Sequence, residues 1–245
     1  MKASAFEFRI RFWILLALYT LGFTAPWDYA LHLDGAGPNT HVWGRLAILL
    51  SRAGLNIDAA FNLVLATGIL VALAGAWLRT WASAYLGPEV MRDRSLRGDG
   101  VVADGPYRYV RNPLYLGLWL NLLALALLMP PSGAIFALAL VAAFQLRLIL
   151  AEEAFLTAKL GDAYTAYCAR VPRSLPALRP QIAPSGARPH WAQAALAEIF
   201  LWGVVVSYAA FGWRYDAHLL IQCVLVSLGA VLVSRGLSMQ TQPAA

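Results

Sequence analysis

Charged residues are scarce in this sequence. Asp, Glu, Lys and Arg make up only 13% of its 245 residues, whereas about 25% is usual in soluble domains. The shortage, together with a hydrophobic content of 60%, argues against a soluble domain and indicates an integral membrane protein. The net charge of +6 needs no nucleic-acid partner, because Lys and Arg gathered in cytoplasmic loops give the same excess and suit an anionic lipid surface.

Cysteine and histidine are also rare. Cys168 and Cys223 lie far apart, and neither belongs to a C-x-x-C pair. The sequence therefore offers no disulfide framework and no cysteine-based metal motif. Because the four histidines are scattered along the chain, we expect no metal ion in this protein.

Apolar runs are what the sequence has in abundance. A helix that crosses a bilayer needs about 20 apolar residues. The runs that reach or approach this length are 12–33, 58–80, 113–130, 132–150, 193–213 and 217–234. The stretch 42–55 is shorter and is interrupted by Arg45 and Arg52, so we expect an interfacial or re-entrant helix there. The sequence thus predicts an all-α integral membrane protein with about six transmembrane helices.

The distribution of Arg and Lys orients this bundle. Pro130 and Pro131 break the helical pattern between two runs and predict a helical hairpin. The hairpin places 87–112 and 151–190 on the same side of the membrane. These segments carry Arg92, Arg94, Arg97, Arg108 and Arg111, and Lys159, Arg170, Arg173, Arg179 and Arg188. By the positive-inside rule this side is cytoplasmic, and an even number of spans brings both termini there.

The chain divides into three parts in this reading. Residues 1–57 hold a retained first span and the short apolar segment, because no cleavage site follows the N-terminal run closely. Residues 58–180 form a core. Residues 181–245 contain the rest of a proline-rich linker and two further spans, which look like additions to the core.

The stretch GPYRYVRNPLYLG, residues 105–117, predicts the start of a helix with aromatic and cationic neighbours. Asn112 is the expected N-cap and Pro113 suits the first turn. Free backbone N–H groups near Tyr115 and Gly117 would favour an anion. Candidate cofactor-binding residues in this stretch are Tyr107, Arg111, Asn112, Pro113, Tyr115 and Gly117.

Glu152 and Glu153 follow the fourth apolar run directly. Adjacent carboxylates at the end of an apolar helix need partners, since burial of an isolated carboxylate is very costly. The nearest cations in the predicted topology are Arg111, Arg108 and Arg79. A solvated pair on an ordinary interfacial helix is the alternative.

Arg79 lies between Trp77 and Trp81 near the cytoplasmic end of the second run. Its guanidinium either faces the bundle and binds an anion, or extends to the lipid headgroups within an aromatic belt. Spacing alone leaves both interpretations open.

Four ordered blocks together resemble the isoprenylcysteine carboxyl methyltransferases and their phospholipid methyltransferase relatives. They are the segment with Gly75, Leu78, Arg79 and Ala82; GPYRYVRNPLYLG; Glu152-Glu153; and LGDAYTAY with Val171-Pro172-Arg173. The resemblance covers about 68–180. Asn112 stands where the prenylcysteine enzymes usually have histidine, and this asparagine favours a lipid or another small membrane acceptor. Leu160, which replaces an aromatic residue, is a second departure from the pattern.

The resemblance implies S-adenosylmethionine as the cofactor, bound on the cytoplasmic side, with a lipophilic acceptor entering from the bilayer. Glu152 and Glu153 would hold hydroxyl or ammonium groups of the donor, and Arg111 with Asn112 would hold its carboxylate. Arg79 and Glu153 are the candidate catalytic residues, with Arg79 orienting the acceptor.

Two other functions remain open from the sequence. A membrane reductase with a nicotinamide cofactor could use a related core. A non-catalytic membrane scaffold or transporter component is the other alternative. The clustering of polar residues on one face argues against a transport path.

The topology can be tested by labelling. Cysteines introduced into 87–112 and 151–190 should stay unmodified by a membrane-impermeant reagent in intact cells, because both segments are expected in the cytoplasm. Labelling of one segment but not the other would refute the hairpin.

Overall fold

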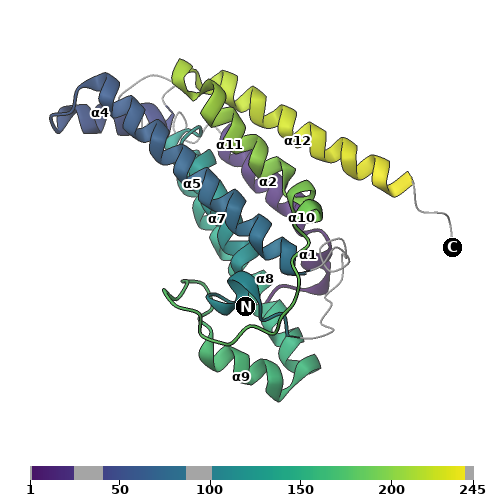
Figure 1. Ribbon diagram of the computed structural model, residues 1–245. Helices are drawn as coiled ribbons and strands as arrows, with labels where there is room; N and C mark the ends of the chain where they lie inside the picture. Colours follow the sequence, from purple (N-terminus) through teal and green to yellow (C-terminus); the bar gives the residue numbers. More distant parts are fainter. Residues whose placement is uncertain (1, 25–40, 87–100, 241–245) are drawn as a thin grey trace.

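The computed structural model describes residues 2–24, 41–86 and 101–240, and within these ranges the chain forms helices and no strands (Figure 1). The all-α class is therefore confirmed for this part of the chain. The α-helices are α1 (Ala5–Arg9), α2 (Arg11–Thr24), α4 (Val42–Arg52), α5 (Ile57–Leu86), α7 (Pro113–Ala126), α8 (Pro131–Leu160), α9 (Asp162–Arg170), α10 (Trp191–Ala197), α11 (Ile199–Phe211) and α12 (Ala217–Gln240). Two short 3-10 turns are η1 (Gly105–Arg108) and η2 (Gly212–Arg214).

Two described helices, α5 and α8, are long and apolar enough to cross a membrane, and each has 30 residues. The pair of α10 and the helical stretch from α11 through η2 adds a third if it counts as one span bent by 70°. The apolar stretches Arg11–Thr24, Pro113–Ala126 and Ala217–Ala230 are shorter. Residues 25–33 of the predicted first span and Arg92, Arg94 and Arg97 lie outside the described residues.

The short apolar stretch after residue 41 forms α4, which packs on the start of α5 (Figure 1). Trp43 and Ala47 are buried there, whereas Leu49 is exposed. The backbone N–H groups of Val42 and Trp43 donate to the carbonyls of Met129 and Leu127, at 3.0 and 2.9 Å. The free donors at the start of α4 thus satisfy free acceptors just after α7, which leaves fewer unpaired backbone groups at either helix end.

The expected break between two apolar runs is present, because α7 ends at Ala126 and α8 begins at Pro131. In this hairpin α7 packs against α8, and α7 also packs against α5. Gly75 of α5 and Gly117 of α7 meet at the crossing of these helices. A Cβ atom on Gly75 would lie 2.8 Å from the carbonyl oxygen of Gly117. The two backbones can approach this closely only because neither residue has a side chain.

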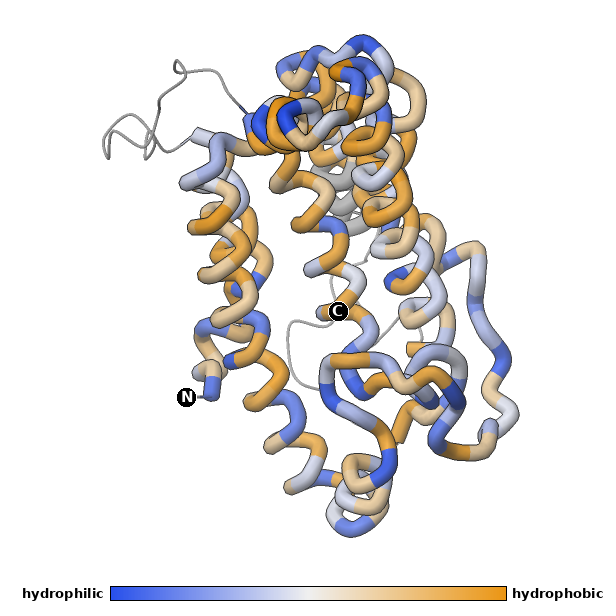
Figure 2. Tube along the Cα trace, turned by 90° about the vertical axis from the view of Figure 1, so that its left-hand side faces the viewer, coloured by the Kyte–Doolittle hydropathy of each residue, from blue (hydrophilic) through white to orange (hydrophobic). Residues whose placement is uncertain are grey.

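Hydrophilic residues lie at both ends of the bundle, beyond mostly hydrophobic helices (Figure 2). We call the end formed by η1, α9 and the linker the polar end (Figure 1). The apolar core lies along α5, α7, α8 and α11 and includes Leu122, Leu125, Val141 and Val204. The candidate site residues of η1 and of the end of α8 belong to the polar end.

The glycine contact predicts a difference between two glycine-to-alanine variants. Gly75→Ala should lower the free energy of unfolding by about 1–3 kcal/mol, because the new methyl group forces α5 and α7 apart. Gly44→Ala is the matched control: it lies in α4 with nothing within 4 Å of the added Cβ, so it should stabilise by up to about 1 kcal/mol through helix propensity. Thermal unfolding in detergent measures both, and equal melting temperatures would contradict the close packing.

Candidate functional site

Glu153 is the centre of the polar end of the bundle. It is only 8% exposed on α8, and two cations reach its carboxylate. Arg173 donates from Nε and Nη2 at 2.9 and 2.8 Å to Oε2, and Arg111 lies with its Nη1 3.1 Å from Oε1. The amide of Asn112 donates to Oε1 at 3.3 Å. One carboxylate therefore joins α8, the segment before α7, and the segment after α9.

The expected partners of the two glutamates are partly correct. Arg111 does pair with Glu153. Arg108 does not, because its Nε donates to the Ile182 carbonyl at 2.9 Å. Arg79 does not either, because it pairs with Glu198. Arg173, which belongs to the Val-Pro-Arg block, takes the place of both.

Asn112 is the N-cap residue of α7, as predicted, but it does not cap the helix with its side chain. Its amide instead donates to Glu153 and, at 3.1 Å, to the carbonyl of Arg173. Pro113 follows as the first residue of α7 and lacks an N–H group, so the helix loses little. The Asn112 side chain thus bridges α8 and the segment after α9.

Glu152 has a different environment from its neighbour. Its carboxylate accepts a hydrogen bond from the hydroxyl of Tyr115 at 3.0 Å. Tyr115 lies in the first turn of α7. The two adjacent acids are thus divided between two tasks: Glu153 binds arginines, and Glu152 faces a phenol at the start of the next helix.

Tyr107 and Arg111 each bring a buried donor without a partner to this region. Tyr107 in η1 is 7% exposed, and its hydroxyl has no hydrogen-bond partner, while its backbone carbonyl accepts from Tyr167 at 2.9 Å. The Nε of Arg111 is also buried without a partner. Burial raises the pKa of Tyr107, the charge of Glu152 raises that pKa further, and Arg79 opposes them. The phenol therefore lies within electrostatic reach of both Glu152 and Arg79, and orphaned donors of this kind fit a polar ligand.

Gly117 serves the packing of helices. A Cβ atom on it would lie 2.5 Å from Cγ of Arg79 and 2.9 Å from the carbonyl oxygen of Gly75. The space beside Gly117 is thus filled by α5, and this glycine allows the close approach of the α5 backbone.

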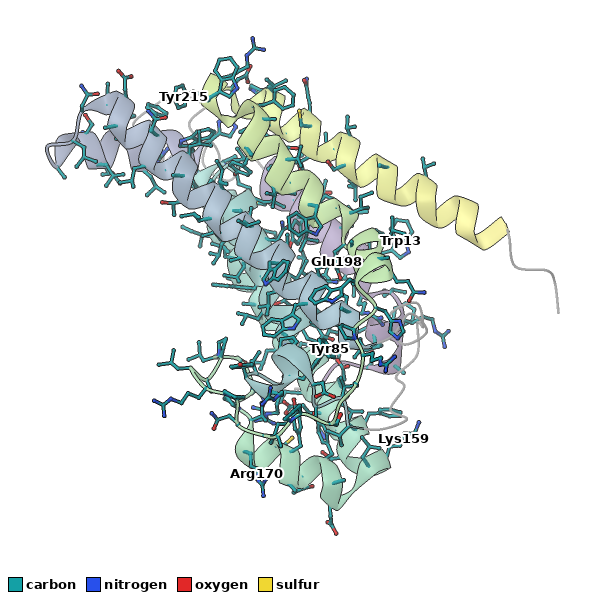
Figure 3. All side chains as sticks on the ribbon, viewed as in Figure 1. Trp13, Tyr85, Lys159, Arg170, Glu198 and Tyr215 are labelled. Atoms are coloured by element: carbon teal, nitrogen blue, oxygen red, sulfur yellow. The ribbon has the colours of Figure 1, made fainter. Side chains whose placement is uncertain are left out.

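Arg79 faces into the bundle and has a carboxylate partner, so the lipid-headgroup interpretation is wrong. Its Nε and Nη2 donate to Glu198 at 2.7 and 3.0 Å. Ser83 donates to the same carboxylate at 2.7 Å. Glu198 lies where α10 meets α11 (labelled in Figure 3). Our sequence reasoning missed Glu198, although a lone ionisable residue within the apolar run 193–213 was a signal for it.

The linker after α9 is fastened across η1. The carboxylate of buried Asp104 accepts hydrogen bonds from the backbone of Ser185 and Ala187, at 2.8 and 3.0 Å, and from the Ser185 hydroxyl. The backbone N–H of Gln181 donates to the carbonyl of Arg108 at 2.9 Å. Burial tends to raise the pKa of Asp104, but these hydrogen bonds outweigh it and hold that pKa below its usual value. The linker thus covers the polar end of the bundle.

Comparisons with known proteins match this same region. Residues 63–163 match the phospholipid methyltransferase family. They include Arg79, the start of α7 and both glutamates, so the match covers most of the polar cluster.

One curated relative is a Schizosaccharomyces pombe protein named protein-S-isoprenylcysteine O-methyltransferase. It is 33% identical over 107 residues, which make up 42% of this chain and 45% of the relative. The matched part thus spans less than half the length of either protein. No solved structure matches the chain.

The Asp104 contacts predict a pH-dependent attachment of the linker. Because its pKa is lowered in the folded state, the stabilisation is complete above the unfolded value of about 4 and is lost as the pH falls through the folded pKa. Hydrogen–deuterium exchange of the peptide 181–189 should rise over that range. Asp104→Asn should raise it already at neutral pH, whereas Asp162→Asn, at an exposed site on α9, should not. Equal protection in the two variants would refute the clamp.

Proposed function

We propose that this protein is an S-adenosylmethionine-dependent membrane methyltransferase that acts on a lipophilic acceptor. The observation that carries the proposal is the polar cluster that Glu152 and Glu153 of α8 form with the start of α7. This cluster lies inside the segment that matches the phospholipid methyltransferase family. The name of the Schizosaccharomyces pombe relative supports the same reaction class. Both matches favour a methyltransferase over a nicotinamide-dependent reductase or a scaffold.

In this proposal the donor binds between η1, the start of α7 and the end of α8. S-adenosylmethionine supplies an activated methyl group on a sulfonium centre. Glu152 accepts hydrogen bonds from donor hydroxyl or ammonium groups, beside the hydrogen bond that it already accepts from Tyr115. The unpartnered hydroxyl of Tyr107 and the Nε of Arg111 would donate hydrogen bonds to the carboxylate of S-adenosylmethionine. Glu153, with Asn112, holds Arg111 in place, and Pro113 and Gly117 fix the start of α7.

Catalysis of methyl transfer depends mainly on alignment. Orientation of two reactants can supply several kcal/mol of the barrier, roughly 7–11 kcal/mol in the best cases. Rigid pairing of the side chains around Glu153 supports such alignment, because each polar contact there joins different elements of the chain.

The acceptor enters from the bilayer in this proposal. A hollow of about 340 Å³ on α5 is lined by Leu70, Leu73, Ala74 and Trp77. These residues follow helical spacing on one face, and Leu70 and Trp77 are strongly exposed. An apolar face of this kind suits an acyl or prenyl chain and cannot hold the charged donor. Arg79, on the same helix, would lie next to the reacting group of the acceptor.

We also propose the finer topology. Six spans require that α2, α7 and α12 cross the membrane with help from residues beyond their described apolar parts. Both termini and the polar end of the bundle then face the cytoplasm. The excess of Arg and Lys in 87–112 and 151–190 supports this orientation.

The donor site is tested by binding of S-adenosylhomocysteine to the purified protein in detergent, measured by calorimetry and thermal shift. Glu152→Gln should weaken binding by about 1–3 kcal/mol, the usual cost of losing a hydrogen bond to a charged group. Glu7→Gln is the matched control, because the Glu7 carboxylate is paired with Arg147, at 2.8 Å.

Stabilisation by a nicotinamide dinucleotide instead of S-adenosylhomocysteine would favour the reductase. Equal S-adenosylhomocysteine affinity in both glutamine variants, with the fold intact, would remove Glu152 from the donor site.

A further inference from the structure

All three nitrogen atoms of the Arg79 guanidinium already donate to the protein itself. Glu198 takes two of them in a bidentate pair, and the third, Nη1, donates to the carbonyl of Leu114 at 3.2 Å. The Glu198 side chain is 2% exposed and the Arg79 side chain 20% exposed. A bidentate arginine–carboxylate pair is among the strongest hydrogen-bonded arrangements in proteins. The charge of Arg79 is therefore neutralised, and a second anion is attracted to it only weakly.

This ion pair borders the proposed donor site. Leu114, which accepts from Arg79, directly precedes Tyr115, which donates to Glu152. The buried hydroxyl of Tyr107 has no hydrogen-bond partner, and the charges of Glu152, Arg79 and Glu198 all influence its pKa. A group bound next to Arg79 would thus lie close to a methyl donor held by Glu152.

The position of Glu198 is fixed by packing of the C-terminal helices on α5. Trp191 of α10 stacks on Trp77, with 5.9 Å between ring centroids. Trp202 of α11 donates to the hydroxyl of Thr80 at 3.0 Å. These contacts hold both sides of the bend at Glu198. The carboxylate comes from outside residues 63–163, the segment that matches the family.

We infer that Glu198 determines acceptor specificity: by neutralising Arg79 it excludes acceptors that react through a carboxylate and selects a lipophilic amine. The inference rests on the proposed methyltransferase function. Because Glu198 cancels the charge of Arg79, the pair has no net positive charge to attract an acceptor carboxylate, and the Glu198 oxygens repel one. An amine headgroup meets a carboxylate-bearing wall and Ser83, with no such repulsion.

The chemistry of an amine acceptor balances without a further reactant. The neutral amine nitrogen donates its lone pair to the methyl carbon, and the carbon–sulfur bond of the donor breaks with its electron pair staying on sulfur. The products are a methylammonium group, which loses a proton to water, and the thioether S-adenosylhomocysteine.

The test compares two acceptors with the full chain in mixed micelles. Phosphatidylethanolamine presents an amine, and N-acetyl-S-farnesylcysteine presents a carboxylate. For the unmodified protein, kcat/KM should favour the amine by at least roughly tenfold, because the neutralised Arg79 does not attract the carboxylate. Glu198→Gln should shift the ratio of the two kcat/KM values toward the carboxylate by at least roughly tenfold.

Two further variants separate specificity from a structural role. Glu198→Asp keeps the charge and should keep the preference for the amine even where total activity falls. Glu7→Gln should leave the ratio unchanged. A merely structural Glu198 would lower both rates together in Glu198→Gln and leave their ratio as it was, which would overturn the inference.

The remaining outcomes are also decisive. Where Glu198→Gln fails to fold, the unmodified protein and Glu198→Asp decide: equal or better use of the carboxylate by the unmodified protein overturns the inference. Binding of S-adenosylhomocysteine without methylation of the amine also overturns it and leaves the donor site standing. Absence of both binding and transfer overturns the proposed function itself.

Discussion

Buried carboxylates must be paired, and in this protein that constraint ties the chain together. Glu153 and Glu198 are both buried, and each is bound by arginines from a distant part of the sequence. A single unpaired charge in such a place costs several kcal/mol. The pairs therefore hold segments that apolar packing alone would not position: the segments before α7 and after α9 meet at Glu153, and α5 meets the bend between α10 and α11 at Glu198.

Close packing of glycines gives these pairs their geometry. Gly75 and Gly117 let α5 and α7 touch backbone to backbone, and the methylene groups of Arg79 lie over Gly117. The guanidinium thereby reaches the Leu114 carbonyl in the first turn of α7. The same turn presents Tyr115 to Glu152. Helix contact and polar contact thus depend on each other, since a shift of α7 along α5 would displace Arg79 and Tyr115 together.

The sequence was sufficient for features that depend on local pattern. Apolar run length predicted the all-α class, the proline pair predicted the break between α7 and α8, and the adjacent acids predicted that Arg111 would be a partner. It was insufficient for the pairing of residues far apart. Arg79 and Glu198 are separated by 119 positions, and no periodicity or motif links them. Asn112 is the predicted N-cap residue, but its side chain makes a tertiary hydrogen bond with Glu153 in place of a local capping bond. The six predicted spans remain a prediction, since the described helices long enough to cross alone are α5 and α8.

The C-terminal helices, which look like additions in the sequence, contribute to the interior of the site region. We propose that the part from residue 181 onward is integral to the function. A core cut at residue 180 would keep Arg79 but lose Glu198, so a buried guanidinium would face Leu114 and Gly117 without a counter-charge. Such a charge either attracts an anion from outside or destabilises the packing of α5 on α7. The chain instead supplies its own carboxylate, placed at a bend that Trp191 and Trp202 fix against α5. Because that carboxylate neutralises the charge that would attract an anionic acceptor, the same contact that stabilises the bundle also restricts what can bind beside it.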